Sequence, residues 1–351
     1  MSANNRDVRP VIFGLKGLEL STEEGAFFHE TRPWGVILFA RNIETRAQLR
    51  ALTDDLREKS GNSNLPIFID QEGGRVARVK PPLVAAYPPA RVYQDLYEQD
   101  PQTGEEAARL GGMLVAHDLF ELGITANCAP CLDIRISGMS DVIGDRAFGD
   151  TAERVMSLAG AHYEGLCQGG VVPVIKHLPG HGRAMVDSHH ALPAVDTDLG
   201  TLADTDFRPF RALSSALMGM TAHIIYDAID AENVSTLSPS VIATTIRDGI
   251  GFGGLLMTDD LSMKALSGDF GERTAKALDA GCDIILHCNA ERAEMKAIAA
   301  AAPLGLVGKT AARAARVEDQ IANRASQVDV HTRQRWGELV GGVFPAAYNA
   351  V

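Results

Sequence analysis

Long apolar stretches are missing from this 351-residue sequence, and so is an apolar leader. No run approaches the roughly 18 apolar residues that a membrane-spanning helix requires. The first residues, Met1 to Pro10, are polar and contain no h-region of a secretory signal. We therefore expect a cytoplasmic protein without a membrane partner.

Cysteine and positive charge are also scarce. An odd count of five cysteines in a chain of this length argues against a disulfide framework and fits a reducing compartment. Cys128 and Cys131 have the spacing of a redox motif, but they lie in an apolar, extended run rather than at the start of a helix, where a thiolate would be stabilised. We expect both to be buried structural residues. The formal net charge of −12 disfavours nucleic acid as a partner.

Linkers and low-complexity segments are absent from the sequence. Hydrophobic residues make up 46% and charged residues 22%, which is typical of a globular protein, and the length suits one α/β barrel. We predict a single domain over residues 1–351, with the barrel at about 10–303 and a C-terminal addition at 304–351. That addition is predicted to hold one more helix, Lys309–Ser326, followed by an irregular tail.

Short apolar runs alternate with segments of helical periodicity along the chain. Eight runs are expected to be strands: Val11–Gly14, Gly35–Phe39, Pro66–Ile69, Ile124–Ala129, Val171–Ile175, Ala216–Thr221, Gly254–Met257 and Asp283–Leu286. Helices are expected at Glu44–Lys59, Glu105–Leu122, Ala152–Gln168, Pro239–Asp248 and Phe270–Ala280. This alternation predicts a parallel sheet with crossover helices, and closure into a (β/α)8 barrel would remove the sheet edges. An open, doubly wound sheet is the alternative.

Titratable side chains stand at the carboxyl ends of the last six predicted strands: Asp70, Asp133, Lys176 with His177, His223, Asp259 and His287. In a barrel, all strands end on the same face, and the active sites of this fold lie there. The pattern therefore predicts an enzyme whose site is assembled at that face.

The segment from Lys176 to His190 is the densest concentration of such residues. Gly180 and Gly182 allow a sharp bend, so we expect a pliable loop that leaves the fifth strand at Lys176. Within it, the Asp187 carboxylate can accept a hydrogen bond from the His189 ring, which would fix the ring's tautomer and stabilise its charged form. Such an imidazole can donate a proton and take it back. A solvated turn is the alternative.

Asp259 and Asp260 are adjacent carboxylates at the end of an apolar strand. Neighbouring residues of a strand face opposite sides, so we expect at most one of them to point into a site. We expect Asp260 to be structural, with Asp260 or Ser262 capping the next helix.

A third cluster runs from Asp70 to Arg78, where two glycines turn the chain and leave Asp70, Arg75 and Arg78 near the rim. Carboxylate and guanidinium groups together can bind sugar hydroxyls or anions. The glycine spacing matches neither nucleotide-binding pattern, G-x-G-x-x-G or Walker A. Gly144–Arg146 is a similar polar turn, and a structural ion pair is the alternative for both.

Five motifs in order carry a family resemblance: Asp70–Arg78, Asp141–Arg146, Lys176–Gly182, Asp187–His189 and Thr258–Met263. Together they resemble the bacterial β-N-acetylglucosaminidases (β-hexosaminidases, NagZ type) of glycoside hydrolase family 3, over roughly residues 10–300. The resemblance implies a (β/α)8 barrel that removes terminal β-linked GlcNAc with retention of configuration. It also implies muropeptide substrates, GlcNAc-1,6-anhydroMurNAc species, in cell-wall recycling.

The resemblance assigns roles to individual residues. Asp259 matches the nucleophile, and His189 matches the acid/base, supported by Asp187. The matching sugar-binding positions are Asp70, Arg78, Arg146, Lys176 and His177. Many members of the wider family take an acidic acid/base from a second domain, for which we expect no room here. Arg183-Ala184 departs from the Asp-Thr common in relatives, which puts contacts of that loop in doubt.

Other functions fit the same residues. A β-glucosidase or a phosphorylase could use the same scaffold, as could a hydrolase in which Asp259 and Asp260 assist the substrate's own acetamido group. A metal hydrolase could use His177, His181, His189 and Asp259 as ligands, and a non-catalytic sugar-binding protein is a further alternative. We expect a monomer with a small carbohydrate substrate and no metal or organic cofactor.

Overall fold

The computed structural model describes residues 7–139, 141–185 and 192–341, and all structural statements below refer to these residues. Asp187 and His189, the predicted acid/base pair, lie outside them. Among the described helices, none is both long and apolar enough to cross a membrane.

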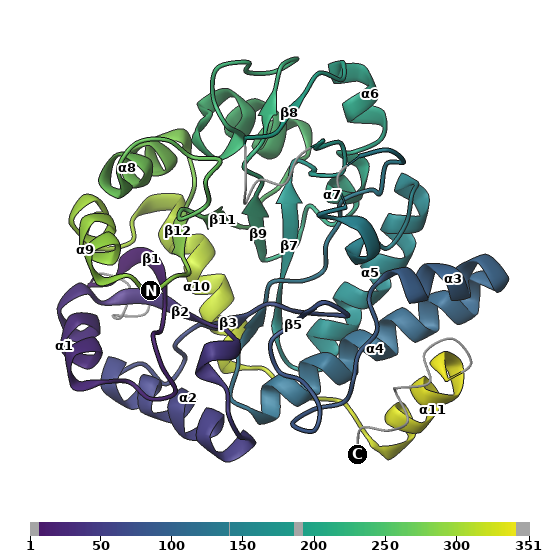
Figure 1. Cartoon of the computed structure of the whole chain (residues 1–351), viewed down its shortest axis with the longest axis horizontal. Helices are drawn as coiled ribbons and strands as arrows, with labels where there is room; N and C mark the ends of the chain where they lie inside the picture. Colours follow the sequence, from purple (N-terminus) through teal and green to yellow (C-terminus); the bar gives the residue numbers. More distant parts are fainter. Residues whose placement is uncertain (1–6, 140, 186–191, 342–351) are drawn as a thin grey trace.

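Eight parallel strands close into a barrel, as the alternating pattern predicts (Figure 1). In order around the barrel, the strands are β1 (Arg9–Gly14), β12 (Ile284–His287), β11 (Leu255–Asp260), β9 (Met218–Thr221), β7 (Val172–Leu178), β6 (Ala126–Asn127), β3 (Ile67–Ile69) and β2 (Pro33–Leu38). Each one overlaps a predicted run, so the closed barrel is confirmed and the open sheet is wrong.

Helices surround the strands and connect them. The α-helices are α1 (Thr22–Thr31), α2 (Arg46–Ser60), α3 (Arg91–Gln99), α4 (Pro101–Glu121), α5 (Ala152–Gln168), α6 (Leu199–Asp204), α7 (Arg208–Ala212), α8 (Phe270–Ala280), α9 (Arg292–Ala301), α10 (Gly308–Ala322) and α11 (Val330–Val340). The helix predicted at Pro239–Asp248 is a π-helix, η5 (Val241–Gly249). Short 3-10 turns occur at η2 (Ala40–Asn42), η3 (Gly144–Arg146) and η4 (Ser235–Leu237). Two small ribbons complete the fold: β4 (Gln71–Gly73) with β5 (Val76–Ala77), and β8 (Ala194–Val195) with β10 (Ile225–Tyr226).

Two large clusters make up most of the core, because each strand buries both of its faces. Along β7, Val172 and Val174 pack in the barrel interior, whereas Ile175 packs outward against the helices. Helix α10 covers one end of the interior with Ala314, Val317 and Ile321, as expected of an added helix that packs on the barrel. Its Glu318 also accepts a hydrogen bond from the indole of Trp34 in β2 (2.9 Å).

The prediction of an irregular tail after residue 326 is wrong for residues 330–340, which form α11. Its Trp336 is 1% exposed and packs against Tyr87 with ring centroids 5.5 Å apart. The helix lies beside α4 (Figure 1) and begins at an Asp329 cap that accepts the Thr332 N–H. The apolar spacing in this short helix is too sparse to predict it; burial of Trp336 against α4 stabilises it.

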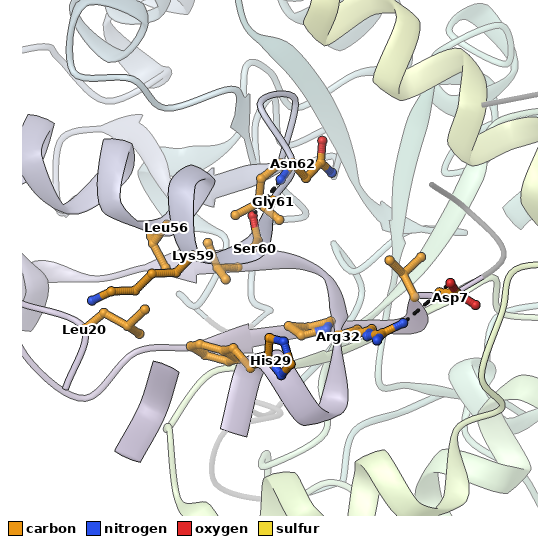
Figure 2. A pocket seen from close by; sticks show the side chains of 14 residues that line it. Asp7, Leu20, His29, Arg32, Leu56, Lys59, Ser60, Gly61 and Asn62 are labelled. Atoms are coloured by element: carbon orange, nitrogen blue, oxygen red, sulfur yellow. Dashed lines mark hydrogen bonds and ion pairs between the residues drawn. The ribbon is translucent and has the colours of Figure 1, made fainter. Parts of the chain in front are cut away.

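A cavity of about 290 Å³ lies between α1 and α2, near the beginning of β2 (Figure 2). Apolar side chains such as Leu20, Phe28 and Leu56 line it, together with Arg32 and Lys59. None of the described residues predicted to act in the site lines this cavity. Strand β2 starts there and ends on the opposite side of the barrel, where the titratable residues gather.

Candidate active site

The structure brings together Asp70, Arg78, Arg146, Lys176 and His177 with Asp259 at the carboxyl ends of the strands. These are all the predicted site residues that the structure describes. Asp187 and His189 stay predictions, because they belong to the segment 186–191.

Lys176 is the centre of a buried charge network. Its Nζ lies 3.0 Å from Asp70 and 2.7 Å from Glu72, and only 3% of its side chain is exposed. Asp70 also pairs with Arg78 at 3.2 Å. An ammonium group has three donors, of which these two carboxylates use two. These two carboxylates therefore hold the ammonium group in place.

Glu72 is a functional candidate that the sequence analysis missed. Its carboxylate receives two hydrogen bonds from Arg146, from Nε at 2.9 Å and from NH2 at 2.7 Å, in addition to the contact with Lys176. The signal was its position two residues after Asp70, because residues two apart in an extended chain face the same side. Arg146, predicted to hold the sugar, is thus itself held by Glu72.

The network carries three cations and two carboxylates, all charged. Burial alone would raise the pKa of Asp70 and of Glu72, but Lys176 with Arg78 holds the pKa of Asp70 below its usual value, and Arg146 with Lys176 does the same for Glu72. Burial alone would lower the pKa of Lys176, yet the two carboxylates raise it above its usual value. The surplus positive charge favours a further anion nearby.

Two β-bulges determine which side chains enter the site. Between Ile175 and Leu178, β7 has one more residue than β9, whose paired residues are Gly219 and Thr221. A bulge interrupts the strict alternation of a strand and re-aims side chains. Lys176 and His177 are therefore consecutive, but each reaches a carboxylate, Asp70 and Asp133 respectively.

The second bulge lies in β11, where Met257 and Asp260 pair with Ile284 and Leu286 of β12. Asp259 lies inside this bulge and is partly exposed. Burial raises its pKa, but His223, His177, the Asp260 N–H and Lys176 together lower it below the usual value. The structure thus holds an ionised carboxylate at the end of β11.

The second carboxylate of the pair, Asp260, is held by groups of the protein itself. Asp260 accepts hydrogen bonds from the N–H of Ser262 (3.0 Å), the hydroxyl of Ser262 (2.6 Å) and the N–H of Cys288 (3.1 Å). It is structural, as expected, but it stabilises a turn rather than a helix start. The next helix, α8, begins ten residues later at Phe270 and is capped by Asp269.

The polar turns at Arg75 and Asp145 pack against each other. Arg75 Nε lies 2.9 Å from Asp145, and both side chains are over 40% exposed. Arg75 also donates to the carbonyls of Asp141 and Val142. For Arg75 the structural alternative is therefore correct, whereas Arg146 from the same turn joins the buried network.

The loop predicted to begin at Lys176 begins later in the structure. Strand β7 continues to Leu178, and residues 179–182 are buried. A Cβ on Gly182 would collide with the carbonyl oxygen of Ile134, so this glycine serves close packing rather than bending. Arg183, which departs from the family pattern, pairs with Asp206 at 2.7 Å.

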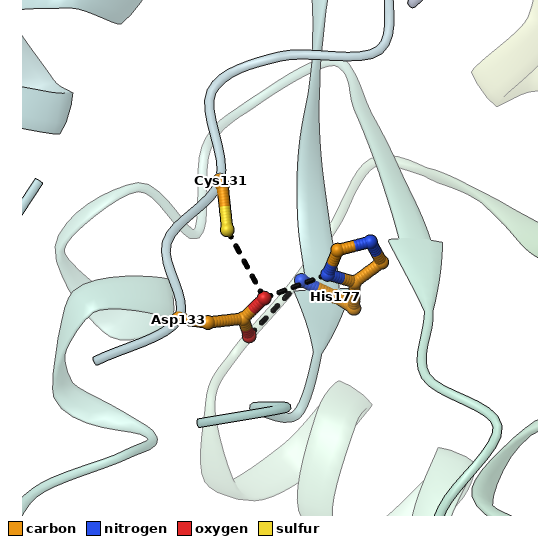
Figure 3. Close-up of side chains that lie close together, drawn as sticks. All are labelled: Cys131, Asp133 and His177. Carbon is orange, nitrogen blue, oxygen red and sulfur yellow. Dashed lines mark hydrogen bonds and ion pairs between the residues drawn. The ribbon is translucent and has the colours of Figure 1, made fainter. Parts of the chain in front are cut away.

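Cys131, Asp133 and His177 place three potential metal ligands within 4.8 Å of one another (Figure 3). Their donor types suit zinc. However, the Asp133 Oδ2 to His177 Nδ1 distance of 2.6 Å is that of a hydrogen bond, and burial raises the pKa of the Cys131 thiol well above its usual value. The cluster is hydrogen-bonded, and Cys128 and Cys131 are both buried, as expected.

Comparison with known proteins decides the family. The sequence profile of the glycosyl hydrolase family 3 N-terminal domain matches residues 17–321. The chain belongs to glycosyl hydrolase family 3.

Relatives within family 3 cover most of the chain. It is 37% identical to a β-hexosaminidase of Methylobacillus flagellatus and 39% identical to one of Alkalilimnicola ehrlichii, in each case over 80% of both chains. The crystal structure of native NagZ from Neisseria gonorrhoeae superposes with a TM-score of 0.85 at 30% identity, covering 95% of this chain and 98% of that one. A family 3 β-N-acetylglucosaminidase from Paenibacillus also gives 0.85 at 30% identity, covering 97% of this chain and 68% of that one.

Proposed function

We propose that this family 3 protein is a retaining exo-β-N-acetylglucosaminidase that removes terminal β-linked GlcNAc. The relatives named β-hexosaminidase and the similar β-N-acetylglucosaminidase structures support the reaction class. The observation that carries the proposal for this chain is Asp259, an ionised, partly exposed carboxylate at the carboxyl end of β11 beside Lys176 and His177. Active sites of barrel enzymes lie at this face.

In the proposed first step, an Asp259 oxygen attacks the anomeric carbon and forms the glycosyl ester, while the glycosidic C–O bond breaks. His189 donates its proton to the departing oxygen, so the leaving group departs as an alcohol. Retaining glycosidases usually use two carboxylates. Here the Asp187–His189 pair takes the role of the second, a proposal that rests on the family resemblance alone.

In the second step, His189 takes a proton from water, and the resulting hydroxide displaces Asp259 from the anomeric carbon. Two inversions give net retention. Asp259 leaves as a carboxylate, and the groups that lower its pKa stabilise this charge. The same groups therefore favour both the attacking form and the leaving form of the nucleophile.

The buried charge network is proposed to bind the sugar. Asp70 and Arg78 lie beside Lys176 and present acceptors and donors to hydroxyl groups, and His177 contributes its second ring nitrogen. Charged groups form stronger hydrogen bonds than neutral ones, and their fixed positions reduce the entropy lost on binding. Arg146 acts at the edge of the network through Glu72.

We further propose that the substrate is a muropeptide fragment carrying GlcNAc-1,6-anhydroMurNAc, hydrolysed in the cytoplasm during cell-wall recycling. The resemblance to NagZ-type enzymes supports this, and the described cysteines, which are all free, fit a reducing compartment.

A paired assay on aryl β-GlcNAc and aryl β-glucoside tests the proposed activity. We expect hydrolysis of the first at a kcat/KM well above that of the second, independent of added phosphate. Preferred cleavage of the glucoside would contradict the assignment to GlcNAc. Release of sugar 1-phosphate only when phosphate is present would show a phosphorylase instead.

Trapping with a 2-fluoro sugar tests the proposed nucleophile. The slow substrate should leave a covalent glycosyl adduct on Asp259, detected by mass spectrometry of the digested protein. An adduct on another residue would overturn the assignment. Failure to trap any adduct, with strong inhibition by a thiazoline mimic, would favour assistance by the substrate's acetamido group.

A further inference from the structure

Asp133 lies between the ends of two neighbouring strands, beside the proposed sugar-binding residue His177. It follows the segment that continues β6. In that segment, Cys131 forms a parallel β-bridge with Lys176 of β7, and the Leu132 N–H donates to the Lys176 carbonyl (2.7 Å). Its side chain is 0% exposed. Figure 3 shows the Asp133 carboxylate directed toward His177 across the gap between the strands.

Four donors converge on this carboxylate. Oδ1 accepts the N–H of His181 at 2.6 Å and the N–H of His177 at 3.3 Å, and Oδ2 accepts His177 Nδ1 at 2.6 Å and the Cys131 thiol at 3.2 Å. Burial alone would raise the pKa of Asp133, but the charge and hydrogen bond of His177 hold it at about 2. Asp133 is therefore an anion at neutral pH.

An anionic carboxylate only accepts hydrogen bonds, so His177 must carry its proton on Nδ1. In the neutral ring, Nε2 then has the free lone pair and can accept a hydrogen bond from a sugar hydroxyl. His177 also lowers the pKa of Asp259. The ring is thus held at Nδ1 by Asp133 and lies close enough to Asp259 to influence its charge.

We propose that Asp133 is a positioning residue that fixes the tautomer and the orientation of His177 in the sugar-binding site. It acts through His177 and does not touch the substrate. It also anchors the chain after β7 through the His181 N–H, so that residues 177–181 form one rigid unit. The expected effect on kcat/KM rests on the proposed hydrolysis of β-GlcNAc. The assignment of the His177 tautomer does not depend on that activity.

Nitrogen-15 NMR of histidine-labelled protein at pH 8 tests the tautomer directly. The His177 signal, assigned by its loss in His177→Ala, should show a protonated Nδ1 and an unprotonated Nε2 in the unmodified protein. In Asp133→Asn, Oδ1 still accepts the two backbone N–H groups, but the amide NH2 faces Nδ1 and donates to it. The proton of His177 should therefore move to Nε2.

Kinetics provide the second readout. We expect Asp133→Asn to lower kcat/KM on aryl β-GlcNAc by about 10- to 100-fold, the usual effect of removing a residue that orients a site ligand. If Asp133 acts through His177, the double variant Asp133→Asn/His177→Ala should lose no more kcat/KM than His177→Ala alone. Cys131→Ala is the matched control, because it removes one contact to the same carboxylate but not the one to His177.

A protonated Nε2 in the unmodified protein would overturn the proposal, and this measurement does not depend on whether any variant folds. The proposal would also be overturned if the fold-losses of kcat/KM in the two single variants multiplied in the double variant. Absence of any β-GlcNAc hydrolysis would instead contradict the proposed function, and the tautomer result would stand separately.

Discussion

Lys176 and His177 are consecutive residues of β7, yet each contacts a carboxylate of the site, Lys176 that of Asp70 and His177 that of Asp133. A regular strand would send them to opposite faces. The extra residue that β7 carries relative to β9 removes this restriction. Strand β11 has a similar extra residue at Asp259. Both β7 and β11 therefore depart from regular strand geometry at the residues that they supply to the site.

Removing the Asp259 carboxylate should abolish turnover. Asp259→Ala should lower kcat/KM by about 10⁴- to 10⁶-fold, the range found when a nucleophile or its supporting carboxylate is removed from other hydrolases. Added azide should partly restore release of the aryl group and yield the α-glycosyl azide, because azide can enter the space left by the carboxylate. Asp145→Ala, which removes an exposed carboxylate, serves as control. A β-configured azide product would contradict the nucleophile assignment.

Replacing His223 should shift the acidic limb of the pH profile. His223 is the largest of the groups that lower the pKa of Asp259, so His223→Asn should raise that pKa. Because Asp259 acts as an anion, activity is present above its pKa and lost as the pH falls through it. The limb of kcat/KM should therefore move to higher pH in the variant. An unchanged limb would show that another group controls it.

Neutralising Glu72 should weaken substrate binding and stability together. Glu72→Gln keeps the shape but leaves Lys176 and Arg146 with one buried anion fewer, and breaking a buried ion pair costs about 3–5 kcal/mol. We expect a higher KM and a lower free energy of unfolding in denaturant titrations. Asp145→Asn, on the exposed pair with Arg75, should cost about 0–1 kcal/mol. Equal effects of the two substitutions would contradict the proposed role of the buried network.

Asp187→Ala should discriminate between leaving groups. If the Asp187–His189 pair donates the proton, glycosides with poor leaving groups should lose far more rate than activated aryl glycosides, which need little protonation. Rates with a series of leaving groups of different pKa measure this dependence. Equal losses across the series would count against an acid role for the pair.

Truncating Trp336 should show that α11 is part of the folded unit. Trp336→Ala removes a buried indole packed on Tyr87 and should lower the free energy of unfolding by about 3–5 kcal/mol. Val330→Ala, on the same helix but 76% exposed, should change it by less than about 0.5 kcal/mol. A single unfolding transition in both variants is expected, and no effect of Trp336→Ala would contradict the packing.

Local patterns in the chain are enough to predict the barrel and the face that carries the site. Apolar runs of strand length, separated by helical segments, specify a parallel sheet, and the titratable residues at the ends of the runs mark one face. Both predictions are correct because the burial of a strand and the position of its end depend on the local sequence. It also sufficed to predict that one carboxylate of the pair Asp259–Asp260 would be structural.

Contacts between distant segments of the folded chain determine which side chains hold one another. Glu72 and Asp133 pair with Arg146 and His177, residues 74 and 44 positions away, and no local pattern encodes such pairings. The bulges in β7 and β11 likewise arise from register between strands that are distant in sequence. The same is true of α11, because the contact that stabilises it lies on Tyr87 and α4 rather than in its own residues.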